Sequence, residues 1–164
     1  MRTRNQRAER DRRAQAKTPD RGLDSGRFRV MIVAHRPRYR ARALRAANGP
    51  GWLVTALLNR QDPIGMLHQK LAHVLVISVD TVTNRNIGYL RAAQPLRSEG
   101  LRVIGIFGEQ TEADSLQEQC DSVVVAPWRT ADLRRNLSLI AVQHGFAPAV
   151  EGRDDDKDVD SDDA

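Results

Sequence analysis

The chain has 164 residues, of which 40% are hydrophobic and 29% are charged, which suits one compact domain and is too short for two independent cores. Its apolar runs are far shorter than the roughly 20 residues of a membrane-spanning helix, and no apolar stretch follows the basic N-terminus as it does in a secretory signal. The single cysteine, Cys120, cannot form an intramolecular disulfide, and the four histidines show no metal-ligand spacing. We therefore expect a cytoplasmic protein with no membrane contact, no metal and no cofactor.

The net charge of +5 conceals a strong asymmetry along the chain. Residues 1–27 hold nine Lys and Arg against four Asp and Glu, whereas residues 151–164 hold eight Asp and Glu against two basic residues. Neither end has enough apolar surface to offset the entropy of ordering it. We predict a disordered basic segment over residues 1–27, a folded domain over 28–146 and a disordered acidic tail over 147–164.

Between these ends, five short apolar runs rich in β-branched residues alternate with segments of helical spacing. The expected strands are 28–34, 52–58, 74–79, 103–107 and 123–126. The expected helices are 37–47, 63–71, 86–98, 112–119 and 130–143. Pro95 should kink or shorten the third helix. Right-handed crossovers then give a (βα)5 α/β fold, a doubly wound, five-stranded parallel sheet of the flavodoxin-like type.

The residues that follow the strands are the candidate site, because ligands bind doubly wound sheets at the carboxyl ends of the strands. In chain order they are Ala34, His35, Ser78, Asp80, Gly108, Ala126, Pro127 and Trp128. His35 has the chemistry to bind an anion or sense pH, or to hydrogen-bond a neighbouring loop. Ser78 and Thr81 are suited to bind a phosphate-like group or to cap the turn into the next helix.

These strand ends, in this order and spacing, resemble the receiver domain of two-component response regulators, the chemotaxis-protein-Y type. Receivers read V-D-D-x-P after the first strand, and this chain reads V-A-H-R-P over residues 33–37. Ser78 follows four apolar residues and lies 44 positions beyond Ala34, a separation typical of the family. The Pro127-Trp128 pair keeps the end of the Lys-Pro-aromatic motif, in which the peptide bond before proline is cis. The resemblance covers residues 28–144 and implies the same (βα)5 fold.

The departures from the receiver pattern concern phosphoryl chemistry. The resemblance implies an acidic pair that holds Mg²⁺, an aspartate that accepts the phosphoryl group and a lysine that pairs with its oxygens. Ala34 and His35 replace the acidic pair, Ser78 the acceptor and Ala126 the lysine, and Gly108 replaces the hydroxyl residue after the fourth strand.

A second register makes Asp80 the acceptor. Asp80 shares a strand face with Ser78, and Gly88 follows it by the eight residues common in receivers. Asp80 would still lack the acidic pair and the lysine, so we expect no phosphorylation in either register.

We therefore interpret the chain as a degenerate pseudo-receiver. It would be a non-enzymatic module of two-component signalling that keeps the fold and acts through protein–protein contacts, with a signalling partner or as a homodimer. By resemblance, the contact face combines the fourth helix, the fifth strand and the fifth helix. Trp128, Arg134 and Arg135 are its candidate residues, although Trp128 equally suits packing over the end of the fifth strand.

Three alternatives stay open. The chain also suits an unrelated flavodoxin-like domain. Residues 78–83, 101–108 and 114–127 resemble the sugar-phosphate-binding half of sugar isomerase domains, in which Ser and Thr at a helix N-terminus hold a phosphate, but the Gly-Ser loop that such domains have after the first strand is absent. The Arg-rich N-terminal segment would strengthen nucleic-acid contacts, yet no recognition helix, zinc finger or aromatic-interleaved basic motif supports specific DNA binding.

Overall fold

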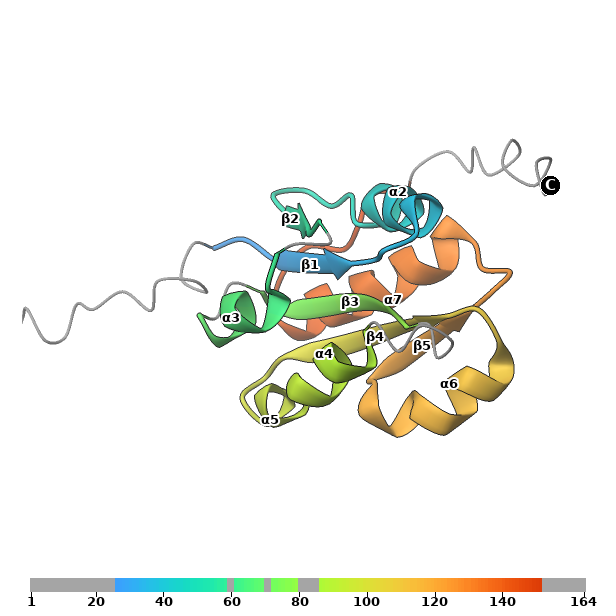
Figure 1. Cartoon of the computed structure of the whole chain (residues 1–164). Coiled ribbons are helices and arrows are strands. Elements are labelled where there is room, and N and C mark those ends of the chain that lie inside the picture. The colour runs from blue at the N-terminus through green and yellow to red at the C-terminus, as the bar shows by residue number, and fades with distance from the viewer. Residues whose placement is uncertain (1–25, 59–60, 70–71, 80–85, 152–164) are drawn as a thin grey trace, which may run out of the picture.

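A five-stranded parallel sheet forms the centre of the computed structural model, which describes residues 26–58, 61–69, 72–79 and 86–151 (Figure 1). The strands are β1 (Arg29–Val33), β2 (Leu53–Ala56), β3 (Val74–Val79), β4 (Arg102–Phe107) and β5 (Ser122–Val125). Their order is β2-β1-β3-β4-β5. This is the flavodoxin-like order, so the predicted fold class is confirmed.

The helices follow the expected segments closely. They are α2 (Pro37–Ala46), α3 (Pro63–His68), α4 (Ile87–Ala92), α5 (Gln94–Arg97), α6 (Gln110–Leu116), the 3-10 turn η1 (Gln117–Gln119), and α7 (Thr130–Gln143). Pro37 and Pro63 each occupy the first helical position, where the missing N–H costs nothing. The segment expected as one third helix is divided at Ala93 into α4 and α5, as Pro95 predicts.

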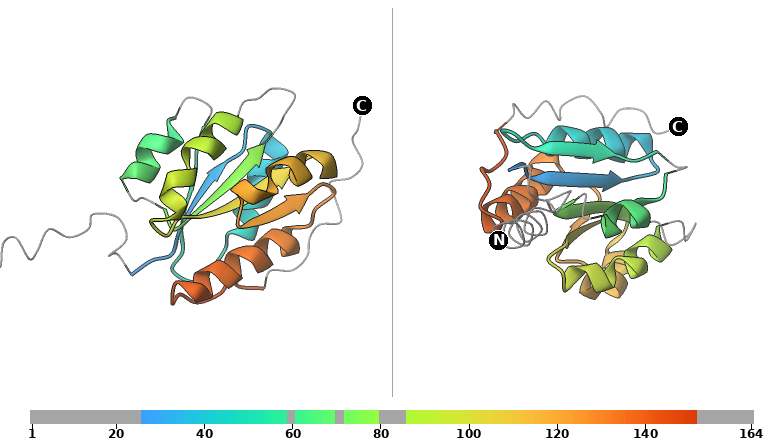
Figure 2. Two further views of the ribbon diagram at one scale, coloured as in Figure 1. Left: turned by 90° about the horizontal axis from the view of Figure 1, so that it is seen from below. Right: turned by 90° about the vertical axis from the view of Figure 1, so that its left-hand side faces the viewer.

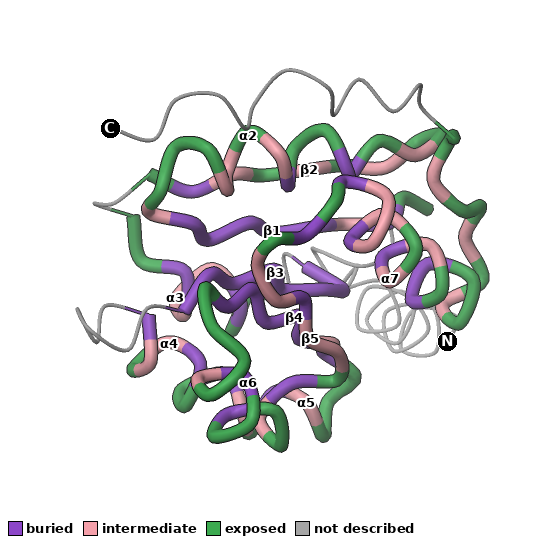
Figure 3. Tube along the Cα trace, turned by 90° about the vertical axis from the view of Figure 1, so that its right-hand side faces the viewer, coloured by how far each residue is buried: buried purple, intermediate pink, exposed green. Residues whose placement is uncertain are grey.

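Alternate residues of each strand face two different helical layers. Val74 and Val76 of β3 belong to the core under α2 and α7, whereas Leu75, Ile77 and Val79 belong to the core under α3, α4, α5 and α6. Figure 2 shows these layers on opposite faces of the sheet, and Figure 3 shows the continuous burial of β3 between them. All six residues of β3 are buried, as expected for the middle strand of a sheet covered on both faces.

An aromatic cluster closes the amino edge of the sheet. Phe28 is fully buried, and its ring centroid lies 4.9 Å from that of Trp52, 5.5 Å from His73 and 5.6 Å from Phe146. The rings of His73 and His144 lie 5.5 Å apart, edge to face. The cluster joins the start of β1 to the loop before β3 and to the end of α7.

Residues 147–150, which we expected in the acidic tail, are attached to the folded domain. The indole N–H of Trp52 donates to the carbonyl of Ala147, 2.9 Å, and the N–H of Val150 donates to the carbonyl of Asn48, 3.0 Å. The N–H of Ala149 donates to Ser138 Oγ on α7, 3.0 Å. The folded part therefore extends beyond residue 146. Residues 1–25 and 152–164 lie outside the described residues, and their disorder stays a prediction.

Within the described residues, every helix is too short or too polar to span a lipid bilayer.

Packing against Gly105 in β4 gives a direct test of the core. A Cβ at this position would lie 2.5 Å from Phe107 Cε2 and 2.8 Å from Cys120 Sγ. We expect Gly105→Ala to lower the free energy of unfolding by about 1–3 kcal/mol, because the buried neighbours must move. Urea denaturation measures this change.

Gly88 in α4 is the matched control. A Cβ there meets no atom within 4 Å, and alanine favours the helix, so Gly88→Ala should leave stability unchanged or raise it by up to about 1 kcal/mol. Equal effects of the two substitutions would contradict this account of the β4 core.

Candidate functional site

The strand register aligns four of the predicted site residues along the carboxyl edge of the sheet. Pairing of β1 with β3 places Ala34 level with Ser78, and pairing of β4 with β5 places Gly108 level with Ala126. The sheet thus brings together the positions that the receiver resemblance singled out. Asp80 and Thr81 lie outside the described residues, so the second register stays untested.

The alternation of strand side chains separates His35 from Ser78. Ser78 continues the series of Val74 and Val76 and faces the α2 side, whereas His35, one residue beyond Ala34, lies on the side of α4. Two small hollows result, and they share no lining residue. One, of about 60 Å³, is lined by Val33, Ala34, His35, Leu57, Leu58, Gln61, Asn86 and Tyr89. The other, of about 190 Å³, is lined by Arg36, Tyr39, Ser78, Val79, Gly108, Glu109 and Glu112.

The end of β3 is held by a residue that the sequence analysis missed. Asn86 is only 3% exposed, and its side-chain amide donates to the carbonyl of Ser78, 2.5 Å. An asparagine just before a helix usually indicates an N-cap, but the Asn86 side chain makes no capping bond to α4. It satisfies a strand carbonyl at the sheet edge instead, and nothing in the local sequence distinguishes these two roles.

The hollow beside Ser78 carries charges of both signs. The guanidinium carbon of Arg36 lies 5.6 Å from the ring centroid of Tyr39, and the carboxylates are those of Glu109 and Glu112. Hydroxyl groups come from Ser78 and Tyr39. The hollow therefore combines cationic, anionic and neutral hydrogen-bonding groups in a small volume.

The described residues at the acidic-pair positions do not fit Mg²⁺, the ion implied by the receiver fold. Mg²⁺ requires hard oxygen ligands in near-octahedral geometry, and the positions of the acidic pair present the methyl group of Ala34 and the imidazole of His35. No group of three or more His, Cys, Asp or Glu in the part of the chain that the structure describes could hold a metal.

Side chains of α2 cover the segment that follows β5. The Ala126-Pro127 peptide bond is cis, as the resemblance implies. Trp128 is only 3% exposed, its carbonyl accepts from Arg42 Nη1 at 2.7 Å, and the Arg42 guanidinium lies 5.0 Å from its ring centroid. Tyr39 packs edge to face on the same ring, 5.8 Å away. Trp128 therefore packs over the strand end and does not belong to an exposed interaction surface, which corrects one of our two interpretations.

Arg134 is also placed differently from our expectation. Its Nη2 lies 3.4 Å from the carbonyl of Arg45 in α2, so it faces α2 and not the α6 side of α7. Arg135 is exposed, and both arginines line a hollow between α7 and residues 148–151. The α6–β5–α7 contact face stays a prediction, but without Arg134 as its marker.

Comparison with known proteins confirms the fold. No protein-family model and no curated protein matches the chain. Among solved structures, a response regulator receiver modulated diguanylate cyclase from Pelobacter carbinolicus is 13% identical, with a TM-score of 0.54 over 72% of this chain and 95% of that one. The isolated REC domain of RcsB from Salmonella enterica serovar Typhimurium is 16% identical, with a TM-score of 0.54 over 76% and 94%. The pilus assembly protein CpaE from Burkholderia thailandensis is 16% identical, with a TM-score of 0.50 over 71% and 99%.

The chain therefore has the receiver-domain fold. The low identities make this a likeness of fold alone.

Two ionisable groups with strongly shifted pKa values lie away from this edge. Burial, with smaller effects from His144 and Arg29, lowers the pKa of His73 to about 4, and its Nδ1 accepts from the N–H of Arg29 at 2.9 Å. Burial raises the pKa of the Cys120 thiol to about 11, so this thiol stays protonated and poorly reactive near neutral pH. Both residues are buried in the folded core, and neither lines a hollow at the carboxyl edge.

His73 predicts acid sensitivity of the fold. Its folded-state pKa lies below the ordinary value of 6.5, so the unfolded chain binds more protons between pH 6.5 and about 4. Stability should fall as pH falls through this window, by up to about 1.4 kcal/mol per pH unit from this group. His73→Asn keeps an acceptor near the Arg29 N–H but does not titrate, so its stability should depend less on pH.

Urea denaturation at several pH values tests this difference. His68→Asn on the exposed surface of α3 is the control and should leave the slope of the wild type unchanged. A His73→Asn variant with the full wild-type slope would show that His73 does not cause the acid sensitivity.

Proposed function

We propose that this chain is a pseudo-receiver, a non-enzymatic cytoplasmic signalling module that acts through protein–protein contacts without Mg-dependent aspartyl phosphorylation. The observation that carries the proposal is the carboxyl edge of a receiver fold in which Ala34, His35, Ser78 and Ala126 occupy the reactive positions. These side chains supply no carboxylate pair and no lysine.

The reactive positions of this edge lack the charges that phosphoryl transfer requires. Phosphoryl transfer depends on positioning the phosphoryl group and neutralising its oxygens. A metal ion bound by carboxylates and a lysine normally supply the neutralising charge, and here their positions hold a methyl group, an imidazole and a second methyl group. The edge therefore has little means to stabilise the transition state or a phosphorylated product.

The hydroxyl group of Ser78 is a poor substitute acceptor. Ser78 is only 2% exposed, and burying a phosphoryl group with about two negative charges is costly without compensating partners. The hollow beside it contains the carboxylates of Glu109 and Glu112 as well as Arg36, so like charges would oppose the new group.

The similar structures support a regulatory role for the fold. One is described as a response regulator receiver modulated diguanylate cyclase and another as the isolated REC domain of RcsB. A domain that keeps this architecture and lacks the reactive residues retains its helical faces for contacts with a partner protein. We extend this role to the present chain as part of the proposal.

Acetyl phosphate tests the proposal directly. The chain is incubated with acetyl phosphate and Mg²⁺, and its intact mass is measured beside a receiver domain that carries the acidic pair, the aspartate and the lysine. We expect the mass of this chain to stay unchanged while the control receiver gains one phosphoryl group.

A phosphoryl gain by the wild type that is lost in Asp80→Asn would overturn the proposal and establish the second register. A gain that is lost only in Ser78→Ala would overturn it in favour of an unusual serine acceptor.

A further inference from the structure

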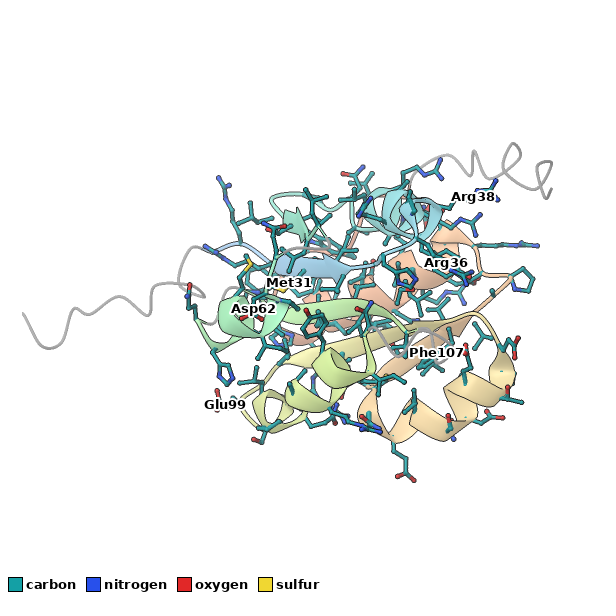
Figure 4. All side chains as sticks on the ribbon, viewed as in Figure 1. Met31, Arg36, Arg38, Asp62, Glu99 and Phe107 are labelled. Atoms are coloured by element: carbon teal, nitrogen blue, oxygen red, sulfur yellow. The ribbon has the colours of Figure 1, made fainter. Side chains whose placement is uncertain are left out.

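The fixed charges are divided unequally between the two helical layers. The layer of α2, α7 and their flanking residues holds eight arginines and one acidic residue, Asp132, counted over residues 36–47 and 129–144. The helices of the opposite layer, from α3 to η1, hold two arginines and three acidic residues. Figure 4 shows Arg36 and Arg38 at the end of the molecule where α2 begins. One layer is therefore strongly basic, and the other is slightly acidic.

Three exposed or half-exposed arginines lie where the end of α2 meets the first turns of α7. Arg134 Nη2 lies 3.4 Å from the carbonyl of Arg45, so the Arg134 guanidinium lies against the last turn of α2, and Arg135 lines the same hollow as Arg134. We call the area formed by Arg45, Arg134 and Arg135 the α2–α7 basic surface. Among the described residues, no carboxylate lies within ion-pair distance of Arg45, Arg134 or Arg135. Clustered cations create a positive potential that attracts an anionic partner.

The chain leaves the described part of the structure on this same surface. The hydrogen bonds of Ala149 to α7 and of Val150 to the loop after α2 fix the path of the segment between the two helices. Glu151 then lines, together with Arg134 and Arg135, an open hollow of about 650 Å³.

We propose that the α2–α7 basic surface is a docking surface for an acidic segment, and that its occupant is residues 154–163 of the same chain. This segment contains seven aspartates and one lysine. Asp154, the third residue beyond Glu151, can lie about 10 Å from it, and the ten residues 154–163 extend up to about 33 Å, whereas α2 is about 15 Å long. The segment is therefore long enough to run along the whole surface.

Covalent attachment lets the acidic segment compete with other anionic partners for the basic surface. A short linker holds the acidic segment at an effective concentration on the order of millimolar, so weak ion pairs suffice to keep the surface occupied. The docked segment covers the arginines and excludes other anionic partners, which gives the domain a built-in, salt-sensitive cover. The inference does not rest on the proposed pseudo-receiver function, because it concerns a different face of the domain.

Paramagnetic relaxation measured on the full-length chain tests the contact. A nitroxide is attached to Ser161→Cys, and the loss of amide signal intensity is recorded on isotope-labelled protein. Cys120 is buried and its pKa is raised to about 11, so labelling near neutral pH is selective for the new cysteine. If mass spectrometry shows a second label, the experiment is repeated with Cys120→Ala.

The expected result is loss of signal at the amides of Arg45, Arg134 and Arg135 at about 0.02 M salt, and its recovery at about 0.5 M salt, where charges are screened within a few ångströms. Arg135→Glu should reduce the effect on α2 and α7. The matched control is Arg91→Glu, which reverses an equally exposed helical arginine on the opposite layer and should change nothing.

Other patterns of signal loss would overturn the proposal. Loss confined to residues 1–27 would identify the basic N-terminal segment as the occupant's site, and uniform loss or none would show that the segment does not dock. In a further sample, isotope-labelled chains without a nitroxide are mixed with nitroxide-labelled chains without the isotope. Signal loss in this mixture would show that the contact is between copies. Loss that persists in Arg135→Glu and at high salt would show that the basic surface does not hold the segment.

Discussion

Burial of β3 on both faces is the constraint on which the rest of the structure depends. All six of its residues are buried, and each apolar side chain contributes roughly 1.5–3 kcal/mol when removed from water. Its alternate side chains enter two separate cores. A shift of the β3 pairing register by one residue would therefore turn each side chain toward the opposite helical layer. The register with β1 and β4 is thereby fixed. It follows that Ser78 faces α2 and His35 lies on the side of α4, and no local adjustment brings them into one pocket.

The residues at the carboxyl edge serve mainly to hold the elements together. The Asn86 side-chain amide donates to the carbonyl of Ser78 near the end of β3. The Arg42 guanidinium, from α2, donates to the carbonyl of Trp128 and lies over its ring. A hydrogen bond from a charged donor is worth roughly 1.5–3 kcal/mol, so Arg42 fixes the relation of α2 to the start of α7. In an active receiver, the corresponding edge has to keep charged groups available to a ligand. Here the receiver's acidic-pair and lysine positions hold Ala34, His35 and Ala126, and the charges beside Ser78 come instead from Arg36, Glu109 and Glu112.

Much of the fold could be predicted from sequence because the information was local. The apolar run of 74–79 indicates a buried parallel strand, and Pro95 indicates the break between α4 and α5. The errors concern contacts between distant residues. The sequence shows an aromatic residue at Trp128 but not that Arg42, 86 positions away, covers it, and it shows an asparagine at 86 but not that a strand carbonyl lies beside it. The polar composition of residues 147–150 likewise gives no sign of their hydrogen bonds to α7 and to the loop after α2.

The basic surface follows from topology more than from composition. The connection from β1 to β2 crosses the sheet in one direction, and the connections from β2 through β5 cross it in the other. Because each crossover is right-handed, α2 lies on one face and the helices from α3 to α6 lie on the opposite face. The last helix, α7, then covers the face that α2 leaves open. Two arginine-rich segments that are far apart in the sequence therefore become neighbours, whereas the acidic residues of α6 and η1 lie across the sheet. The folded domain thus has two electrostatically distinct faces, which the modest net charge of the chain does not reveal. Only the basic face can attract an aspartate-rich segment.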